Sequence, residues 1–210
     1  MSAPDTVSAG GVRWRRFAVM FGLTGVATAG LMALTAQGVL AANFSISGMP
    51  FVVAADELNG QGFEQFATLD TTREGNPNLA DEGGQKVLIV SAINTATLTK
   101  LCQSVSLGGA YLKITAGDAG TPVSAKALVV DSDQINGNAD FTNIEVGGDA
   151  GLFNKVKNPN TGEDVVGPDY VFGQQADAVQ IKNLWQNNYA TTAAKFTLPH
   201  LRMSFSSTGC

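Results

Sequence analysis

The chain has 210 residues, 44% of them hydrophobic, which allows one ordinary globular domain and a short appendage. Its 24 glycines, together with many Thr, Val and Asn residues, favour turns and strands over helices. Residues 17–210 carry 10 basic and 17 acidic side chains, a net charge of −7, and an acidic body without a basic stripe argues against nucleic acid as a partner.

The N-terminal region combines a short basic cluster with a long uncharged segment. The cluster and its tryptophan, which we expect at the inner membrane interface, are Arg13, Trp14, Arg15 and Arg16. Residues 17–42 contain no charge, and residues 17–34 alone would rise about 27 Å as a helix, close to a bilayer core. This order predicts a cytoplasmic tail at 1–16 and an exported body. A cleaved signal peptide and a retained transmembrane anchor both fit residues 17–42.

Small residues recur within the uncharged segment. Gly25, Ala29 and Ala33 stand at four-residue spacing, the pattern that lets membrane helices approach closely. A retained helix would therefore associate with a second copy or with a small membrane-protein partner, in contact with membrane lipid. A leader peptide is also rich in Ala and Gly, so the pattern has an ordinary explanation as well.

Residues 43–210 form the predicted exported domain, and its first part reads as strands. Residues 43–47 and 51–55 predict a strand pair, and 62–71 a further strand. Residues 86–97 begin with the apolar run expected of a buried strand. Between them, residues 72–85 are polar and predict an exposed loop.

The second part centres on an Asn-Gly pair. Residues 122–147 predict two strands joined by a tight turn at Asn136-Gly137, because both residues tolerate positive φ. Residues 147–167, rich in Gly, Asn and Pro, predict a long surface loop. Two or three strands complete the domain, and Pro199 places the last of them at an edge or a bulge.

Two short phrases recur in the same order along the chain. They are DELNG at 56–60 with DQING at 133–137, and LTKLCQ at 98–103 with IKNLWQ at 181–186. The similar spacings predict an internal duplication with pseudo-repeats at 43–117 and 118–210.

About ten strands with turn residues between them, and no convincing amphipathic helix, predict an all-β domain. An antiparallel β-sandwich or barrel fits best, with a β-solenoid as the alternative. One N-terminal transmembrane or signal helix precedes it.

The residues nominate no catalytic site, metal or cofactor. There is no G-x-S-x-G nucleophile elbow, His200 is the only histidine, and the acidic run 131–137 lacks the calcium-loop spacing. Cys102 and Cys210 are the only cysteines, and in an exported chain they most simply form one disulfide.

Several phrases together resemble one family of exported actinomycete proteins of unknown function, which automatic annotation often labels "cholesterol esterase". They are the Arg-rich start with its apolar leader, AADELNGQGF, LTKLCQSV, ADFTNIEVG, FGQQADAVQIKNLWQ and ATTAAKFTLPHLRMSF with the terminal cysteine. The resemblance covers nearly the whole chain and implies that Cys102 and Cys210 belong to the family pattern. It implies no catalytic residues, and nothing in the sequence supports the esterase label.

Two functions from different classes follow. The first is a non-enzymatic cell-envelope protein, membrane-anchored or secreted, that binds lipid or another hydrophobic ligand or assembles with itself or a membrane partner. The alternative is a lipid-ester hydrolase with a non-standard site. A view of an apolar cavity, and covalent labelling of a serine by a fluorophosphonate, would separate them.

Overall fold

The computed structural model describes residues 45–72 and 84–210. The expected tail and membrane segment, with Arg13, Trp14, Arg15, Arg16, Gly25, Ala29 and Ala33, lie outside the described residues, as does most of the expected polar loop. In the described part of the chain, no helix is long and apolar enough to cross a membrane.

The described chain is nearly all strand, which confirms the predicted fold class. Its elements are β1 (Ser45–Ile46), β2 (Phe51–Thr72), β3 (Gln85–Thr99), β4 (Leu101–Ser106), β5 (Tyr111–Ala116), β6 (Val123–Thr142), β7 (Glu145–Asp149), the 3-10 helix η1 (Ala150–Leu152), β8 (Phe172–Thr197) and β9 (Arg202–Ser206). They form one sheet in the order β7-β8-β6-β3-β2-β4-β5-β9, with β1 pairing in parallel with β2. All other pairings are antiparallel, which rules out the stacked parallel rungs of a β-solenoid.

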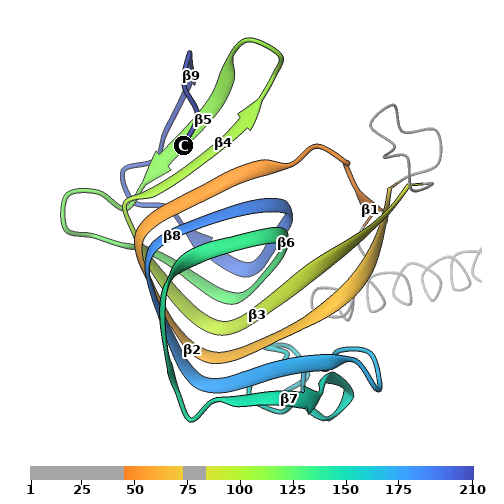
Figure 1. The fold of residues 1–210 in the computed structure, drawn as a ribbon. Coiled ribbons are helices and arrows are strands. Elements are labelled where there is room, and N and C mark those ends of the chain that lie inside the picture. Colours follow the sequence, from red (N-terminus) through yellow and green to blue (C-terminus); the bar gives the residue numbers. More distant parts are fainter. Residues whose placement is uncertain (1–44, 73–83) are drawn as a thin grey trace, which may run out of the picture. The chain divides into compact units, whose positions relative to one another are not determined.

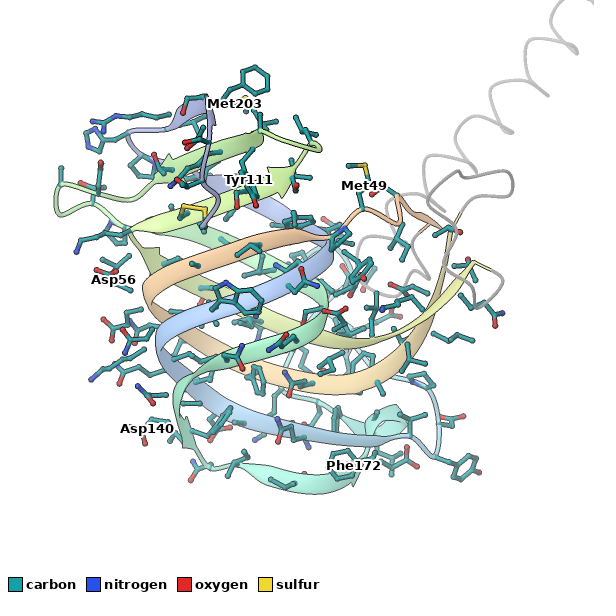
Figure 2. The ribbon with its side chains drawn as sticks, turned by 45° about the horizontal axis from the view of Figure 1, so that its top comes forward. Met49, Asp56, Tyr111, Asp140, Phe172 and Met203 are labelled. Atoms are coloured by element: carbon teal, nitrogen blue, oxygen red, sulfur yellow. A yellow bond between two sulfur atoms is a disulfide. The ribbon has the colours of Figure 1, made fainter. Side chains whose placement is uncertain are left out.

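Four long strands close this sheet on itself. β2 pairs with β3, β3 with β6, β6 with β8, and β8 with β2 again. The register round the ring leads from Phe51 to Asn188, Ser132, Ile89 and Ala67, so it returns to β2 well beyond its starting point. A large shift of this kind requires strands that are strongly tilted to the axis. Figure 1 and Figure 2 show them as broad bands that wrap round a barrel.

The Asn-Gly pairs lie inside strands, so the predicted hairpin turn at Asn136-Gly137 is wrong. β6 continues through this pair with a register shift against β8 between Asn136 and Asn138. A Cβ at Gly137 would lie 2.5 Å from Ile181 Cγ2, and one at Gly60 in β2 would lie 2.8 Å from Ile93 Cγ2. Both glycines therefore permit close packing between curved strands, and a bulge takes the place of the turn.

The second recurring phrase has a structural counterpart in both copies. Lys100 and Asn183, third in their respective phrases, both have positive φ, 52° and 54°. Cys102 and Trp185, two residues further along, pair with Ala54 from opposite sides of β2. These likenesses agree with the expected duplication, which stays a prediction.

The inner face of the barrel holds the main apolar core. Leu58, Phe63, Ile93, Leu128 and Leu184, from β2, β3, β6 and β8, are all buried there. The apolar residues alternate with outward-facing ones along each strand, as the two-residue period of a strand requires.

A second core lies outside the barrel under residues 150–167. After η1 this segment has almost no regular structure and much of it is exposed, as a surface loop is, but part of it is buried against the sheet. Phe153, Val156 and Val165 are buried against Phe66 and Val129 of the sheet. Isolated apolar residues without a period gave no signal of this packing in the sequence.

Three side chains of the sheet hold that segment in place. Glu64 Oε1 accepts hydrogen bonds from Lys155 N at 2.5 Å and Val156 N at 2.7 Å. Asn94 donates to Lys155 O and accepts from Lys157 N, both at 2.7 Å. Gln175 Oε1 accepts from Asn154 N at 3.1 Å. The segment is therefore fastened along its backbone and not only by its apolar side chains.

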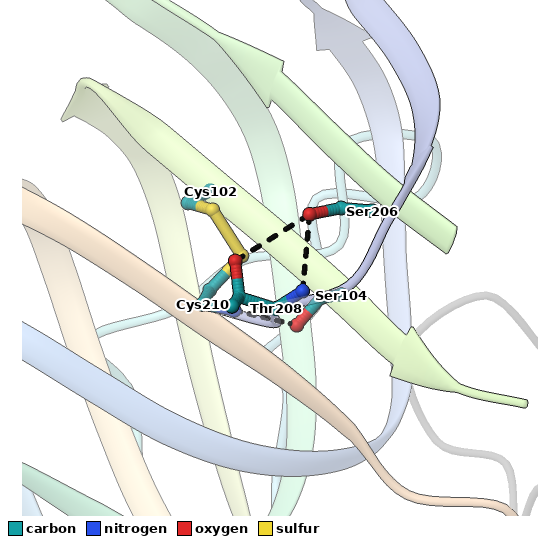
Figure 3. Close-up of a disulfide and its surroundings, with 5 residues drawn as sticks. All are labelled: Cys102, Ser104, Ser206, Thr208 and Cys210. Atoms are coloured by element: carbon teal, nitrogen blue, oxygen red, sulfur yellow. Dashed lines mark hydrogen bonds between the residues drawn. A yellow bond between two sulfur atoms is a disulfide. The ribbon is translucent and has the colours of Figure 1, made fainter. Parts of the chain in front are cut away.

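The sheet continues beyond the ring as β4, β5 and β9, which stand above the barrel in Figure 1. As predicted, Cys102 in β4 is joined to Cys210, with the two Cα atoms 5.9 Å apart. Ser104 Oγ accepts a hydrogen bond from Cys210 N at 2.9 Å (Figure 3). β9 is an edge strand that follows Pro199, also as predicted.

Candidate functional site

The barrel holds an apolar cavity of about 300 Å³ that is partly open to solvent. Its wall is built by the inward side chains of β2, β3, β4, β6 and β8, which alternate along strands that pass round the axis. The apolar part of the wall consists of Val53, Leu58, Phe63, Ile89, Ile93, Leu98, Leu101, Leu128, Val130, Ile135, Gly137, Ala139, Phe141, Ile181 and Phe196. Ligand pockets in proteins commonly begin at about this volume and are apolar in the same way.

Asn188 is the one described side chain of the wall whose polar atoms are fully buried without a partner. Asn188 of β8 is 1% exposed, and neither its Oδ1 nor its Nδ2 makes a hydrogen bond among the described residues. An unpaired buried polar group costs about 1–3 kcal/mol. A bound molecule that forms hydrogen bonds with the Asn188 amide would therefore recover free energy that the protein loses.

Another polar group in the wall is satisfied within the protein. Gln65 Nε2 donates to Ser91 Oγ at 2.9 Å, and Gln65 Oε1 accepts from Gln174 Nε2 at 2.6 Å. This chain of contacts fixes the Gln65 side chain and leaves Ser91 as its acceptor. Asn188 differs from Gln65 in that both polar atoms of its side chain are buried without a partner.

None of the described residues that line the cavity is acidic, basic, a histidine, a cysteine or a tyrosine. The remaining polar members of the wall are Gln65, Ser91, Gln103, Gln186, Asn188 and Thr191. The cavity therefore offers hydrogen bonds and apolar contact, without a charged group or a titratable acid or base.

Residues 47–210 match the model of a family of unknown function, DUF6230. The chain belongs to this family. No curated protein and no solved structure matches the chain, so the label "cholesterol esterase" has no support.

Three buried carboxyl groups of this DUF6230 member lie outside the cavity wall. Glu64, Asp70 and Asp131 are all at most 2% exposed. Burial raises the pKa of Glu64 to about 7, although the hydrogen bonds from Val156 N and Lys155 N act in the opposite direction. Burial raises the pKa of Asp131 to about 7, with a further contribution from the charge of Asp70, whose own pKa burial also raises.

Raised pKa values often mark catalytic groups. Glu64 and Asp131, however, lie next to parts of the chain that belong to the outer core. Glu64 fastens the segment 150–167, as described above. Asp131 pairs with Val90 of the outer core in the neighbouring strand. No three His, Cys, Asp or Glu side chains among the described residues are placed to hold a metal ion.

The inner face of the sheet continues from the cavity onto the extension β4–β5–β9. Gln103, which lines the cavity, pairs with Ile114, and Ile114 pairs with Met203 of β9. Directly paired residues lie on one face of a sheet, so Met203 and the neighbouring Phe205 extend that face. Both are exposed, Phe205 by 74%, and Figure 2 shows Met203 at the far end of the extension.

The sequence missed the residues that matter most in this site. Of the site residues it nominated, Cys102 and Cys210 are joined, and the helix-packing and interface residues lie outside the described part. Asn188 was missed because nothing local separates it from its neighbour Asn187, which donates to Asp133 at 2.8 Å on the exposed side. Only the closed register decides which of the two asparagines faces inward.

Proposed function

We propose that this protein is a non-enzymatic cell-envelope protein that binds a small hydrophobic ligand inside its barrel. The observation that carries the proposal is the apolar cavity of about 300 Å³ with the unpartnered Asn188 amide in its wall. A core that served stability alone would gain by closing such a space, because lost contacts and an unpaired amide both cost free energy.

The size of the cavity limits the ligand class. About ten groups the size of a water molecule fill 300 Å³ at roughly 30 Å³ each, and a methylene group is of similar size. An aliphatic chain of about ten carbons or a compact isoprenoid therefore fits. Burial of each methylene would contribute about 0.8 kcal/mol before the costs of association.

The wall gives no support to a hydrolase. Ester hydrolysis through a serine needs a neighbouring base to activate the hydroxyl group. Ser91 is a buried serine of the wall, but its contact is with the amide of Gln65, which cannot act as that base. We therefore place ligand binding first.

The envelope location rests on the basic N-terminus, the uncharged segment 17–42 and the disulfide. Disulfides persist mainly in oxidising compartments, which agrees with export. We expect N-terminal sequencing of protein from the native host to find residues 17–34 retained in at least part of the population. A mature chain that begins uniformly at Ala42 or Asn43 would show that the segment is only a leader and would remove the membrane anchor from the proposal.

Filling the cavity tests ligand binding. Val130 is buried in the wall, so Val130→Trp should occupy much of the space and weaken binding of the fluorescent probe N-phenyl-1-naphthylamine at least tenfold. Ser124→Trp on the same strand, at an exposed position, is the matched control and should leave binding unchanged. Fluorescence titration gives both dissociation constants.

Val130→Ala covers the case in which the tryptophan variant folds poorly. It enlarges the cavity and should shift the preferred length of competing alcohols upwards. If the probe binds equally to wild type, Val130→Trp and Val130→Ala, it binds elsewhere, for example on the exposed face of β9, and the proposal is wrong.

A further inference from the structure

The unpartnered amide of Asn188 indicates what the polar end of the ligand must be. This inference rests on the proposed ligand-binding function and concerns the chemistry of the head group. Asn188 pairs with Phe51 of β2 and with Ser132 of β6, next to the register shifts that bend β6. The neighbouring strands supply no hydrogen bond to the Asn188 amide. The hydroxyl of Ser132, which is paired with Asn188, donates instead to Ile89 O at 3.4 Å.

A carboxamide side chain presents both an acceptor oxygen and donor N–H groups. A hydroxyl group can pair with both through a single oxygen atom, because it donates one hydrogen bond and accepts another. An ether oxygen can only accept, and it would leave Asn188 Oδ1 unpaired.

The charge of the cavity wall excludes ionised head groups. Among the described residues, no acidic or basic side chain lines the cavity to compensate a carboxylate or an ammonium group. Moving an isolated charge into apolar surroundings costs far more than one hydrogen bond returns.

We propose that the cavity binds a neutral aliphatic alcohol of about ten carbons, whose hydroxyl group donates to Asn188 Oδ1 and accepts from Asn188 Nδ2. The alkyl chain lies against the apolar wall, among Phe63, Ile93 and Leu128. The head group thereby supplies the hydrogen bonds that the protein itself does not provide.

The test compares four probes by displacement of N-phenyl-1-naphthylamine from the full chain: 1-decanol, its isomer methyl nonyl ether, decanoate and decylammonium. We expect 1-decanol to bind wild type about tenfold or more tightly than the ether, as the loss of a hydrogen bond to a buried group predicts. The two ions should bind more weakly still at pH 8.

The matched variant is Asn188→Leu, which keeps a similar volume and removes the amide. It should bind 1-decanol and the ether equally, with decanol affinity reduced about tenfold or more. Thr192→Val is the control, because Thr192 also has an unpartnered buried hydroxyl but pairs with Val129 of the outer core. It should retain the preference of wild type.

The outcomes separate the two levels of the proposal. If no probe binds wild type, the ligand-binding function itself fails. If the decyl compounds bind but wild type does not distinguish decanol from its isomer, or prefers decanoate, or Asn188→Leu changes nothing, only the assignment of the head group is overturned. Thermal unfolding of Asn188→Leu checks that the variant is folded, and we expect it to be as stable as wild type or more so.

Discussion

Replacing both Cys102 and Cys210 by serine is expected to reduce the free energy of unfolding by about 4–5 kcal/mol. The disulfide joins residues 108 positions apart, and loop entropy makes the stabilisation by a closure of this length that large, less any strain in the native bond. For a chain of this size such a loss corresponds to a fall in melting temperature of roughly 8–20 °C. Differential scanning calorimetry of wild type and the double variant measures it.

The disulfide also stabilises its immediate surroundings, because it fixes the C-terminal end of the chain. Cys210 lies four residues beyond β9, which among the described strands pairs with β5 alone. Without the bond, the pairing of β9 with β5 must hold the edge strand alone.

Ser104→Ala is the matched control for this prediction. It removes the hydrogen bond that Cys210 N donates and leaves the disulfide, so it should cost about 1 kcal/mol. Equal melting temperatures for wild type and the double variant, or two free thiols in exported protein, would contradict the role given to the disulfide.

The protein should be several kcal/mol more stable at pH 5 than at pH 8. Burial raises the pKa of Glu64 and of Asp131 to about 7 in the folded protein, from ordinary values of 4.5 and 3.8. Between these limits the folded chain holds protons that the unfolded chain has released, so stability falls as pH rises from about 4 to about 7 and is level above that. At about 1.4 kcal/mol for each pKa unit, either group contributes roughly 3–4 kcal/mol. Urea unfolding at several pH values measures the change.

Glu64→Gln and Asp131→Asn isolate the two contributions. Glutamine retains an oxygen that can accept from Lys155 N and Val156 N, so Glu64→Gln should match wild type near pH 5 and exceed it in stability at pH 8. Asp131→Asn should reduce the slope in the same way. A stability that rises between pH 5 and pH 8, or variants that keep the full slope of wild type, would show that these carboxyls are charged in the folded state.

Local patterns in the sequence predicted the class of the fold well. An apolar run predicted a strand at 86–97, residues 51–55 were predicted as another strand, and β3 and β2 cover these positions. Pro199 predicted the break before the edge strand β9, since proline cannot donate to a ladder in mid-sheet. These signals depend on residues that are close together in the chain, so a single sequence is enough to recognise them.

Features that depend on the closure of the barrel could not be predicted from the sequence. Asn136-Gly137 carries a strong turn signal, but the approach of Ile181 to Gly137 and the long pairing with β8 keep the chain extended. Likewise, whether inward residues fill the barrel or leave a cavity depends on how far the register shifts round the ring. The burial of Asn188 follows from that shift and from no local pattern.

The most direct test of the proposed ligand site is a crystal structure of the full chain bound to ω-bromodecanol, with anomalous scattering to locate the bromine. The expected result is a bromine peak within the barrel, against the apolar wall near Phe63 and Leu128, and the hydroxyl group within hydrogen-bond distance of the Asn188 amide. A barrel interior closed by side chains or filled only with water, with bromine bound solely on the exposed face of β9, would contradict it.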